Sequence, residues 1–186
     1  MRDAALQAIA VLARNLVAVQ DAKVLQANEQ LLAALLDASR DYAEQGSDSE
    51  RAKIRSAAAY TLGVVGGQNA RDRLGEMLQA AFPNARYNAA IGLCRHGDTR
   101  AVPVLLAMLD AQNSQVVEGE VSDSERVRKR SLVMMNAIRA AGRLAVAARK
   151  PASDLSDLRD RLAQIRDSDL PQALQNAASE ALTRFP

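Results

Sequence analysis

The chain has 186 residues and a net charge of +2; 48% of its residues are apolar, but only 3% are aromatic. This length is enough for one domain, and so small a net charge excludes strong attraction of the whole chain to nucleic acid. The core must be built from Ala, Leu, Val, Ile and Met, and Ala and Leu are strong helix formers. Since runs of β-branched or aromatic residues bounded by turns are missing, the composition favours an all-α fold.

A single cysteine, Cys94, excludes an internal disulfide. The apolar stretch over residues 4–19 is amphipathic and interrupted by Arg14, which predicts a helix of the domain and not a signal peptide. No run of 18 apolar residues is present, so no membrane span is expected. We therefore favour a cytoplasmic location and one domain over residues 1–186.

Nine helices are predicted along the chain. The first two span residues 3–19 and 24–44, and leucine pairs one turn apart give the second an apolar stripe. Ser47 and Glu50 form a capping box that opens the third helix, because each side chain satisfies a backbone N–H of the other. The same four letters return at residues 122–125, before the seventh helix.

Glycine and proline mark the helix ends. Gly66 and Gly97 end the third and fifth helices, because glycine adopts a positive φ at a C-terminal cap without steric cost. Pro83 and Pro171 stand at the starts of the fifth and ninth helices, and Asp98 helps to cap the sixth. The short turns predict four antiparallel pairs and one unpaired terminal helix. That unpaired helix leaves a second interpretation, in which the chain is a segment of a longer repeat protein.

Between Ile54 and Asp110 the sequence repeats itself at a spacing of 31 residues. A fixed period of this size predicts one helical unit stacked on copies of itself. The repeated positions are Arg55, Ala58, Ala59, Leu62, Gly63 and Gly66 in the first copy, and Arg86, Ala89, Ala90, Leu93, Gly97, Asp98, 101–106 and Leu109 in the second. This pattern resembles the HEAT repeat, in the short subtype recognised in phycobilin lyases. Outside residues 54–110 the resemblance is weaker.

The resemblance implies an all-α, right-handed α-α superhelix of the HEAT/armadillo-like solenoid class. It also implies that the second helix of each pair lines a concave surface. In the repeat itself, small alanines let neighbouring helices approach closely, and Leu62, Val65, Leu93 and Leu105 are predicted to fill the core.

Catalytic chemistry is not indicated by any motif. Cys94 and His96 are the one place where a nucleophile and an imidazole come together, but positions two apart on a helix point about 200° apart. We interpret Cys94 as a small packing residue and His96 as a half-buried residue near a helix end. One His and one Cys do not make a metal site. We therefore expect a protein that is not an enzyme and holds no cofactor.

The outward positions of the second helices are predicted from the helical wheel to form the partner-binding concave face. They are Asp72, Glu76, Gln79, Asp110, Asp160 and Asp167. This mildly acidic strip predicts binding of a basic or amphipathic peptide. The alternative is that these carboxylates only keep the surface soluble.

A basic stretch covers residues 126–150, with eight basic and no acidic side chains. The first turns of its helix hold the candidate anion-binding residues Arg126, Arg128, Lys129 and Arg130. We favour a solvated face balanced by the preceding acidic loop. That loop contains Glu118, Glu120, Asp123 and Glu125. A contact with nucleic acid is the alternative; stacking on single strands is disfavoured by the scarcity of aromatics, whereas duplex phosphates need only cations.

Three classes of function remain. The favoured one is a non-enzymatic scaffold or adaptor that binds a protein or peptide, because repeats offer extended surface. The second is binding of nucleic acid or another polyanion through residues 126–150. The third, suggested only by the repeat subtype, is a subunit of a phycobilin-lyase-like or chaperone-like assembly, which a pigment-transfer assay would test.

Overall fold

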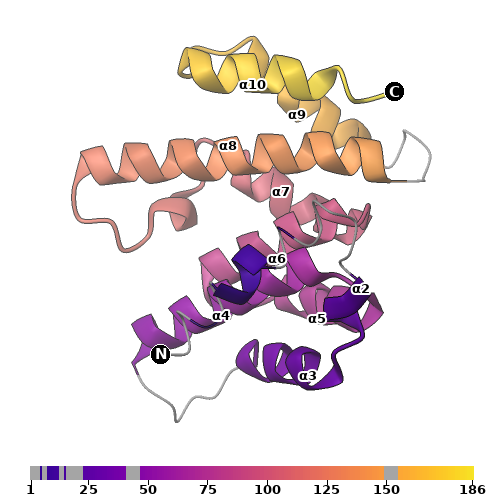
Figure 1. Ribbon diagram of the computed structural model, residues 1–186. Helices are drawn as coiled ribbons and strands as arrows, with labels where there is room; N and C mark the ends of the chain where they lie inside the picture. Colours follow the sequence, from indigo (N-terminus) through magenta and orange to yellow (C-terminus); the bar gives the residue numbers. More distant parts are fainter. Residues whose placement is uncertain (1–4, 6–7, 13–14, 16–22, 41–46, 149–154) are drawn as a thin grey trace. The chain divides into compact units, whose positions relative to one another are not determined.

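The computed structural model describes residues 5, 8–12, 15, 23–40, 47–148 and 155–186. These residues contain helices and turns and no strand, so the predicted all-α fold is confirmed (Figure 1). The chain forms two compact units, Met1–Leu93 and Cys94–Pro186, and the boundary falls within one helix. The first predicted helix lies mostly outside the described residues.

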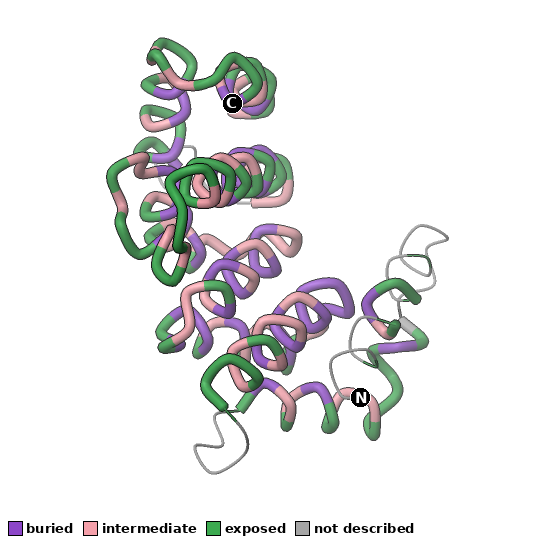
Figure 2. Tube along the Cα trace, turned by 90° about the vertical axis from the view of Figure 1, so that its left-hand side faces the viewer, coloured by how far each residue is buried: buried purple, intermediate pink, exposed green. Residues whose placement is uncertain are grey.

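The N-terminal unit is built from helices that pack in consecutive pairs (Figure 1). They are α2 (Lys23–Gln26), α3 (Glu29–Ala38), α4 (Asp48–Val65), α5 (Gln68–Met77) and most of α6 (Pro83–Arg95). Helix α4 packs against α5, as predicted from the short turn between them, and α3 packs against both. Figure 2 shows the buried residues on the sides of these helices that face a neighbour.

The second predicted helix is two helices in the structure, α2 and α3, separated at Asn28. The Asn28 side chain accepts a hydrogen bond from the N–H of Leu31 at 2.9 Å and so caps α3. Asparagine competes for backbone donors in this way and favours a helix start over a helix interior. Helix α2 is held separately, because Gln26 donates from Nε2 to the carbonyl of Val65 at 2.8 Å. The leucine stripe did not reveal this break because it lies entirely within α3.

Helices α4 and α6 approach each other closely at two glycines. A Cβ placed on Gly63 would lie 2.5 Å from the Cα of Gly92, so backbone meets backbone at this point. The core positions predicted from the repeat are all buried. They are Ala58, Ala59, Leu62, Val65, Ala89, Ala90, Leu93 and Leu105. The helical phase read from the repeat is therefore confirmed.

The C-terminal unit follows from the end of α6. Its elements are η1 (Thr99–Ala101), α7 (Val102–Met108), η2 (Ser114–Val117), α8 (Asp123–Ala147), α9 (Ser156–Arg166) and α10 (Gln172–Leu182). Helix α7 packs against α8 and α9. The terminal helix α10, predicted to have no pair partner, packs against both α8 and α9. The physical reason is its apolar stripe of Leu174, Ala178 and Ala181, which is buried in these contacts.

The predicted cap signals form as expected. Ser47 and Ser122 each build a complete capping box, at the starts of α4 and α8. Gly66 and Gly97 have φ values of 72° and 70°, the conformation that glycine adopts without strain. The loop before α8 contains the short helix η2, which the sequence did not predict. Its Val116 is buried and attaches the loop to α8.

Candidate functional site

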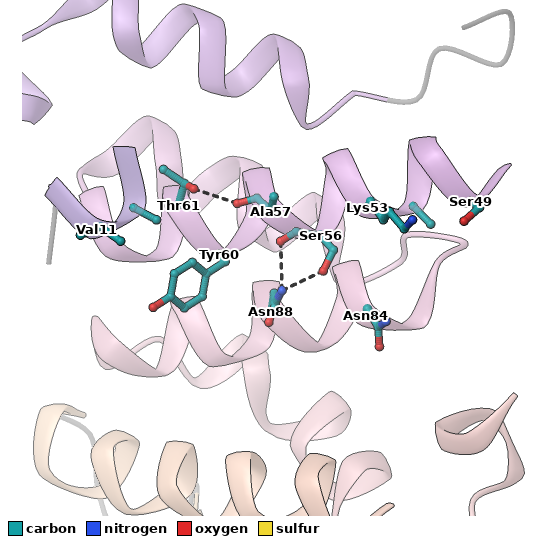
Figure 3. A pocket seen from close by; sticks show the side chains of 11 residues that line it. Val11, Ser49, Lys53, Ser56, Ala57, Tyr60, Thr61, Asn84 and Asn88 are labelled. Atoms are coloured by element: carbon teal, nitrogen blue, oxygen red, sulfur yellow. Dashed lines mark hydrogen bonds between the residues drawn. The ribbon is translucent and has the colours of Figure 1, made fainter. Parts of the chain in front are cut away.

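A groove of 660 Å³ lies along α4 and α6 in the N-terminal unit, with residues 10 and 11 at one end (Figure 3). Its polar lining comes from Lys53, Ser56, Tyr60, Thr61, Asn84 and Asn88. Alanines of α4 supply much of the apolar lining, and their small side chains leave the space open.

Equivalent positions of the two repeat copies lie side by side in this groove. Lys53 and Asn84 are 31 residues apart, as are Ala57 and Asn88, and all four line it. The stacking of one repeat on the next therefore brings matching positions of α4 and α6 together. A partner segment that follows the groove would meet side chains from both repeats.

Asn88 is held in one orientation (Figure 3). Its Nδ2 donates to the carbonyl of Ser56 at 3.0 Å and to the Ser56 hydroxyl at 2.9 Å. The Asn88 Oδ1 accepts no hydrogen bond from the described residues and is left as an acceptor for a ligand. Thr61 is occupied within α4, because its hydroxyl donates to the carbonyl of Ala57 at 2.8 Å.

The chemistry of the groove suits binding. Its lining side chains are amides, hydroxyls, alkyl groups, one phenol and the ammonium of Lys53. Among the described lining residues there is no carboxylate or imidazole, so these residues offer no proton acceptor that works near neutral pH. Sequence reasoning missed this groove because it assigned binding to the second helices. The signal available was Asn84 and Asn88, which share one face of α6 at a spacing of one turn.

The predicted acidic strip begins on α5 with Asp72 and Glu76 and continues past its end to Gln79; all three are exposed. Two of them have local partners. Asp72 accepts from the side chain of Gln68 at 2.9 Å, and Glu76 forms an ion pair with Arg73 at 2.6 Å. The cation reduces the negative charge that this helix presents.

In the C-terminal unit, Asp110 follows α7 and accepts from the N–H of Gln112 at 2.9 Å, so it caps the turn. Asp167 pairs with Arg166 at 2.7 Å, and this hydrogen bond holds the pKa of the Asp167 carboxyl below its usual value. Asp160 is exposed and has no hydrogen bond or ion pair with the described residues. Partner binding by these acidic residues stays a prediction.

Two arginines of the N-terminal unit bind backbone carbonyls at or just after the ends of other helices. Arg73 of α5 donates to the hydroxyl and the carbonyl of Ser39, both at 2.7 Å, at the end of α3. Arg86 of α6 donates to the carbonyls of Ala80 at 2.7 Å and Ala81 at 3.0 Å, in the loop after α5. Carbonyls at helix ends lack partners within the helix, and cations there are favourable. Arg86 was part of the repeat motif, whereas Arg73 was not identified from the sequence.

The candidate anion-binding residues at the start of α8 are partly neutralised. Lys129 pairs with Glu120 at 2.8 Å, and Arg126 pairs with Asp123 at 3.1 Å. Arg128 is exposed and Arg130 is half-buried. These pairs support the interpretation that the preceding acidic loop balances the basic helix. Arg149 and Lys150, at the end of the basic stretch, lie outside the described residues.

Cys94 and His96 differ in how far they are buried. The Cys94 side chain is fully buried, and burial raises the pKa of its thiol to about 12, with the charge of Asp98 acting in the same direction. A thiol with this pKa is protonated at neutral pH and is a poor nucleophile. His96 is half-buried just beyond the end of α6, as predicted. Cys94 therefore acts as a packing residue.

Within the described part of the chain, neither a metal-binding cluster nor a membrane-spanning helix is found. No group of three or more His, Cys, Asp or Glu residues there is placed to hold a metal ion. None of the helices described has the length and apolar character needed to cross a membrane.

A family model described as HEAT repeats matches residues 41–124. The matched segment contains both copies of the 31-residue repeat and extends to the start of α8. It does not distinguish the phycobilin-lyase subtype, which stays a prediction. Comparisons with curated proteins and with solved structures give no match.

Proposed function

We propose that the protein is a non-enzymatic scaffold or adaptor, because residues 41–124 match a family model of HEAT repeats, a class of helical repeat that presents extended surface for protein interaction. Its partner in this proposal is a protein or peptide. The observation that carries the proposal is the groove between α4 and α6, built from matching positions of two repeats.

A peptide segment fits the chemistry of this groove. A peptide carries an N–H donor and a C=O acceptor at almost every residue. The Asn88 Oδ1 accepts from such an N–H, and the exposed Asn84 amide both donates and accepts. Tyr60 adds an aromatic surface with a polar end, the kind of residue enriched at protein interfaces.

The proposal that the protein is not an enzyme rests on the same geometry. The nucleophile candidate Cys94 is buried and protonated, and the groove residues that the structure describes include no carboxylate or imidazole. Binding is what remains for a surface of this composition.

The acidic residues of the second helices are the other candidate surface for the partner. Arg73 and Arg166 each pair with one of these carboxylates. The surface therefore carries less negative charge than its acidic residues alone would give it. We therefore place the partner first in the groove. The second-helix surface serves as the comparison in the test.

The polyanion alternative through residues 126–150 is weaker for a related reason. Arg126 and Lys129 already pair with carboxylates of the preceding loop. A phosphate backbone would have to compete with these pairs. No feature of the structure favours the lyase-like alternative.

The test is photocrosslinking inside the native source. A photoreactive amino acid replaces Lys53 or Asn84, which border the groove and are exposed, and in matched controls replaces Glu76 or Gln79 on the second-helix side. We expect one protein, identified by mass spectrometry, to be crosslinked from both groove positions and from neither control. Adducts from the control positions alone would move the partner to the second helices. Adducts from none of the four would overturn protein binding at either surface.

A further inference from the structure

A second groove, of 500 Å³, lies between α8 and α10 in the C-terminal unit. Helix α8 lines it with Met135, Arg139, Gly142 and Arg143. Helix α10 contributes small side chains, among them Ala173 and Ala177, and a charged pair near its end. The two helices pack directly against each other beneath it.

The charges in this groove are unbalanced. Arg184 forms an ion pair with Glu180 at 2.8 Å, which cancels one positive charge. Arg139 and Arg143 are exposed, stand one turn apart on α8, and form no hydrogen bond or ion pair with the described residues. The contrast with Arg126 and Lys129 on the same helix is direct, because both of those have acidic partners.

Small side chains that pack closely line the groove beside Arg139 and Arg143. A Cβ placed on Gly142 would lie 3.3 Å from Cδ of Arg184 and 3.4 Å from Cβ of Ala181. Ala173 and Ala177 present only methyl groups. Small residues of this kind let the backbone of another chain approach closely. The guanidinium groups of Arg139 and Arg143 would then meet acidic side chains of that chain.

Guanidinium recognises carboxylate with two parallel hydrogen bonds, which gives both strength and geometric specificity. We infer that the groove between α8 and α10 is a docking site for an acidic segment of a protein partner, with Arg139 and Arg143 binding its carboxylates. This goes beyond the proposed function by adding a second surface and the charge of its ligand. It uses no residue of the α4–α6 groove.

A protein segment fits the groove better than nucleic acid does. Affinity for a phosphate backbone rises with the number of phosphates neutralised, and here only two cations lack a partner among the described residues. Single-stranded nucleic acid is bound largely by stacking on aromatic side chains, and none lines this groove. A short groove with two arginines and a methyl-lined wall matches a few carboxylates beside small apolar side chains.

The experiment uses the full chain and a fluorescently labelled peptide of repeated Glu and Ala residues. A second peptide has Gln in place of every Glu. Binding is measured by fluorescence anisotropy at low ionic strength for the wild type, for Arg139→Gln/Arg143→Gln and for Arg126→Gln/Arg128→Gln. The last variant removes the same charge from the same helix but away from the groove, and circular dichroism verifies that each variant folds.

We expect the Glu peptide to bind and the Gln peptide not to bind. Arg139→Gln/Arg143→Gln should weaken binding about tenfold or more, whereas the control should change it less than about twofold. No binding of the Glu peptide, or equal weakening by both variants, would overturn the site. So would duplex DNA that binds as tightly as the Glu peptide and responds to the same variant. Because this test involves no α4–α6 residue, its failure leaves the crosslinking result intact, and the reverse also holds.

Discussion

The grooves at α4–α6 and at α8–α10 each lie between two helices, but different kinds of side chain line them. The first has hydroxyls from α4 and amides from α6, and the second has two arginines without partners among the described residues. The helix contacts beside them differ too, since a Cβ on Gly63 would lie 2.5 Å from the Cα of Gly92, whereas a Cβ on Gly142 would lie 3.3 Å or more from its neighbours. The comparison teaches that helix packing sets where a groove forms, whereas a few surface side chains set its ligand.

The largest expected effect on stability comes from truncation of a buried core side chain in either unit. Leu93 and Leu144 are both fully buried, so each mutation to Ala should lower the free energy of unfolding by ~2–5 kcal/mol. Urea denaturation measures this. Leu132→Ala is the control, because that leucine is 59% exposed and should change stability by less than about 0.5 kcal/mol. A loss at Leu93 no larger than the control's would mean that the helical phase is wrong.

The two glycine contacts should respond differently to an added methyl group. Gly63→Ala places a Cβ against the Gly92 backbone and should cost ~1–3 kcal/mol through overpacking. The Cβ of Gly142→Ala would have its nearest neighbours, atoms of Arg184 and Ala181, at 3.3 Å or more, and the gain in helix propensity of ~0.5–1 kcal/mol should offset the contact. Thermal or urea unfolding of the two variants decides the matter. Equal losses would refute the distinction between the two contacts.

Each unit contains a capping box, and we expect the loss of either box to lower stability by the same amount. Ser47→Ala and Ser122→Ala each remove the hydroxyl that accepts the N–H of Glu50 or Glu125. Each should lower stability by ~1 kcal/mol, measured by denaturant unfolding. Ser49→Ala removes a hydroxyl that makes no cap and serves as the control. A clear difference between the two cap variants would show that the surroundings, and not the cap, determine its contribution.

The smallest expected effect is a pH dependence at the same caps. The hydrogen bond from the backbone N–H of Ser47 lowers the pKa of Glu50 from 4.5, and that of Ser122 does the same for Glu125. A carboxyl with a lowered folded pKa stabilises the fold above its unfolded pKa, and this stability is lost as pH falls through the folded value. The stability difference between wild type and Glu50→Gln should therefore shrink below pH 4.5. NMR titration of both carboxyls provides the direct check, and unshifted values would contradict it.

Much of the fold could be predicted from local sequence because its signals act over a few residues. The spacing of 31 residues gave the repeat, and the letters at 47–50 and 122–125 gave both capping boxes. The break at Asn28 was missed, because an asparagine beside a leucine-rich stretch is compatible both with the exposed face of one long helix and with a helix cap. Only its hydrogen bond to the N–H of Leu31 identifies it as a cap. The polar lining of the α4–α6 groove was missed for a different reason. Asn84 can be assigned to a groove only when Lys53 of the previous repeat is known to line the same groove.

By itself the sequence determined the all-α class, the repeat, the helix caps and the buried face of each repeat, because periodicity and capping are properties of neighbouring residues. Only the tertiary structure decided which charges are left without a partner. Arg126 and Arg139 are the same residue type on one helix, yet Arg126 meets Asp123, whereas Arg139 faces the groove beside α10. Electrostatic pairing depends on distances of a few ångströms between side chains, and folding alone sets those distances.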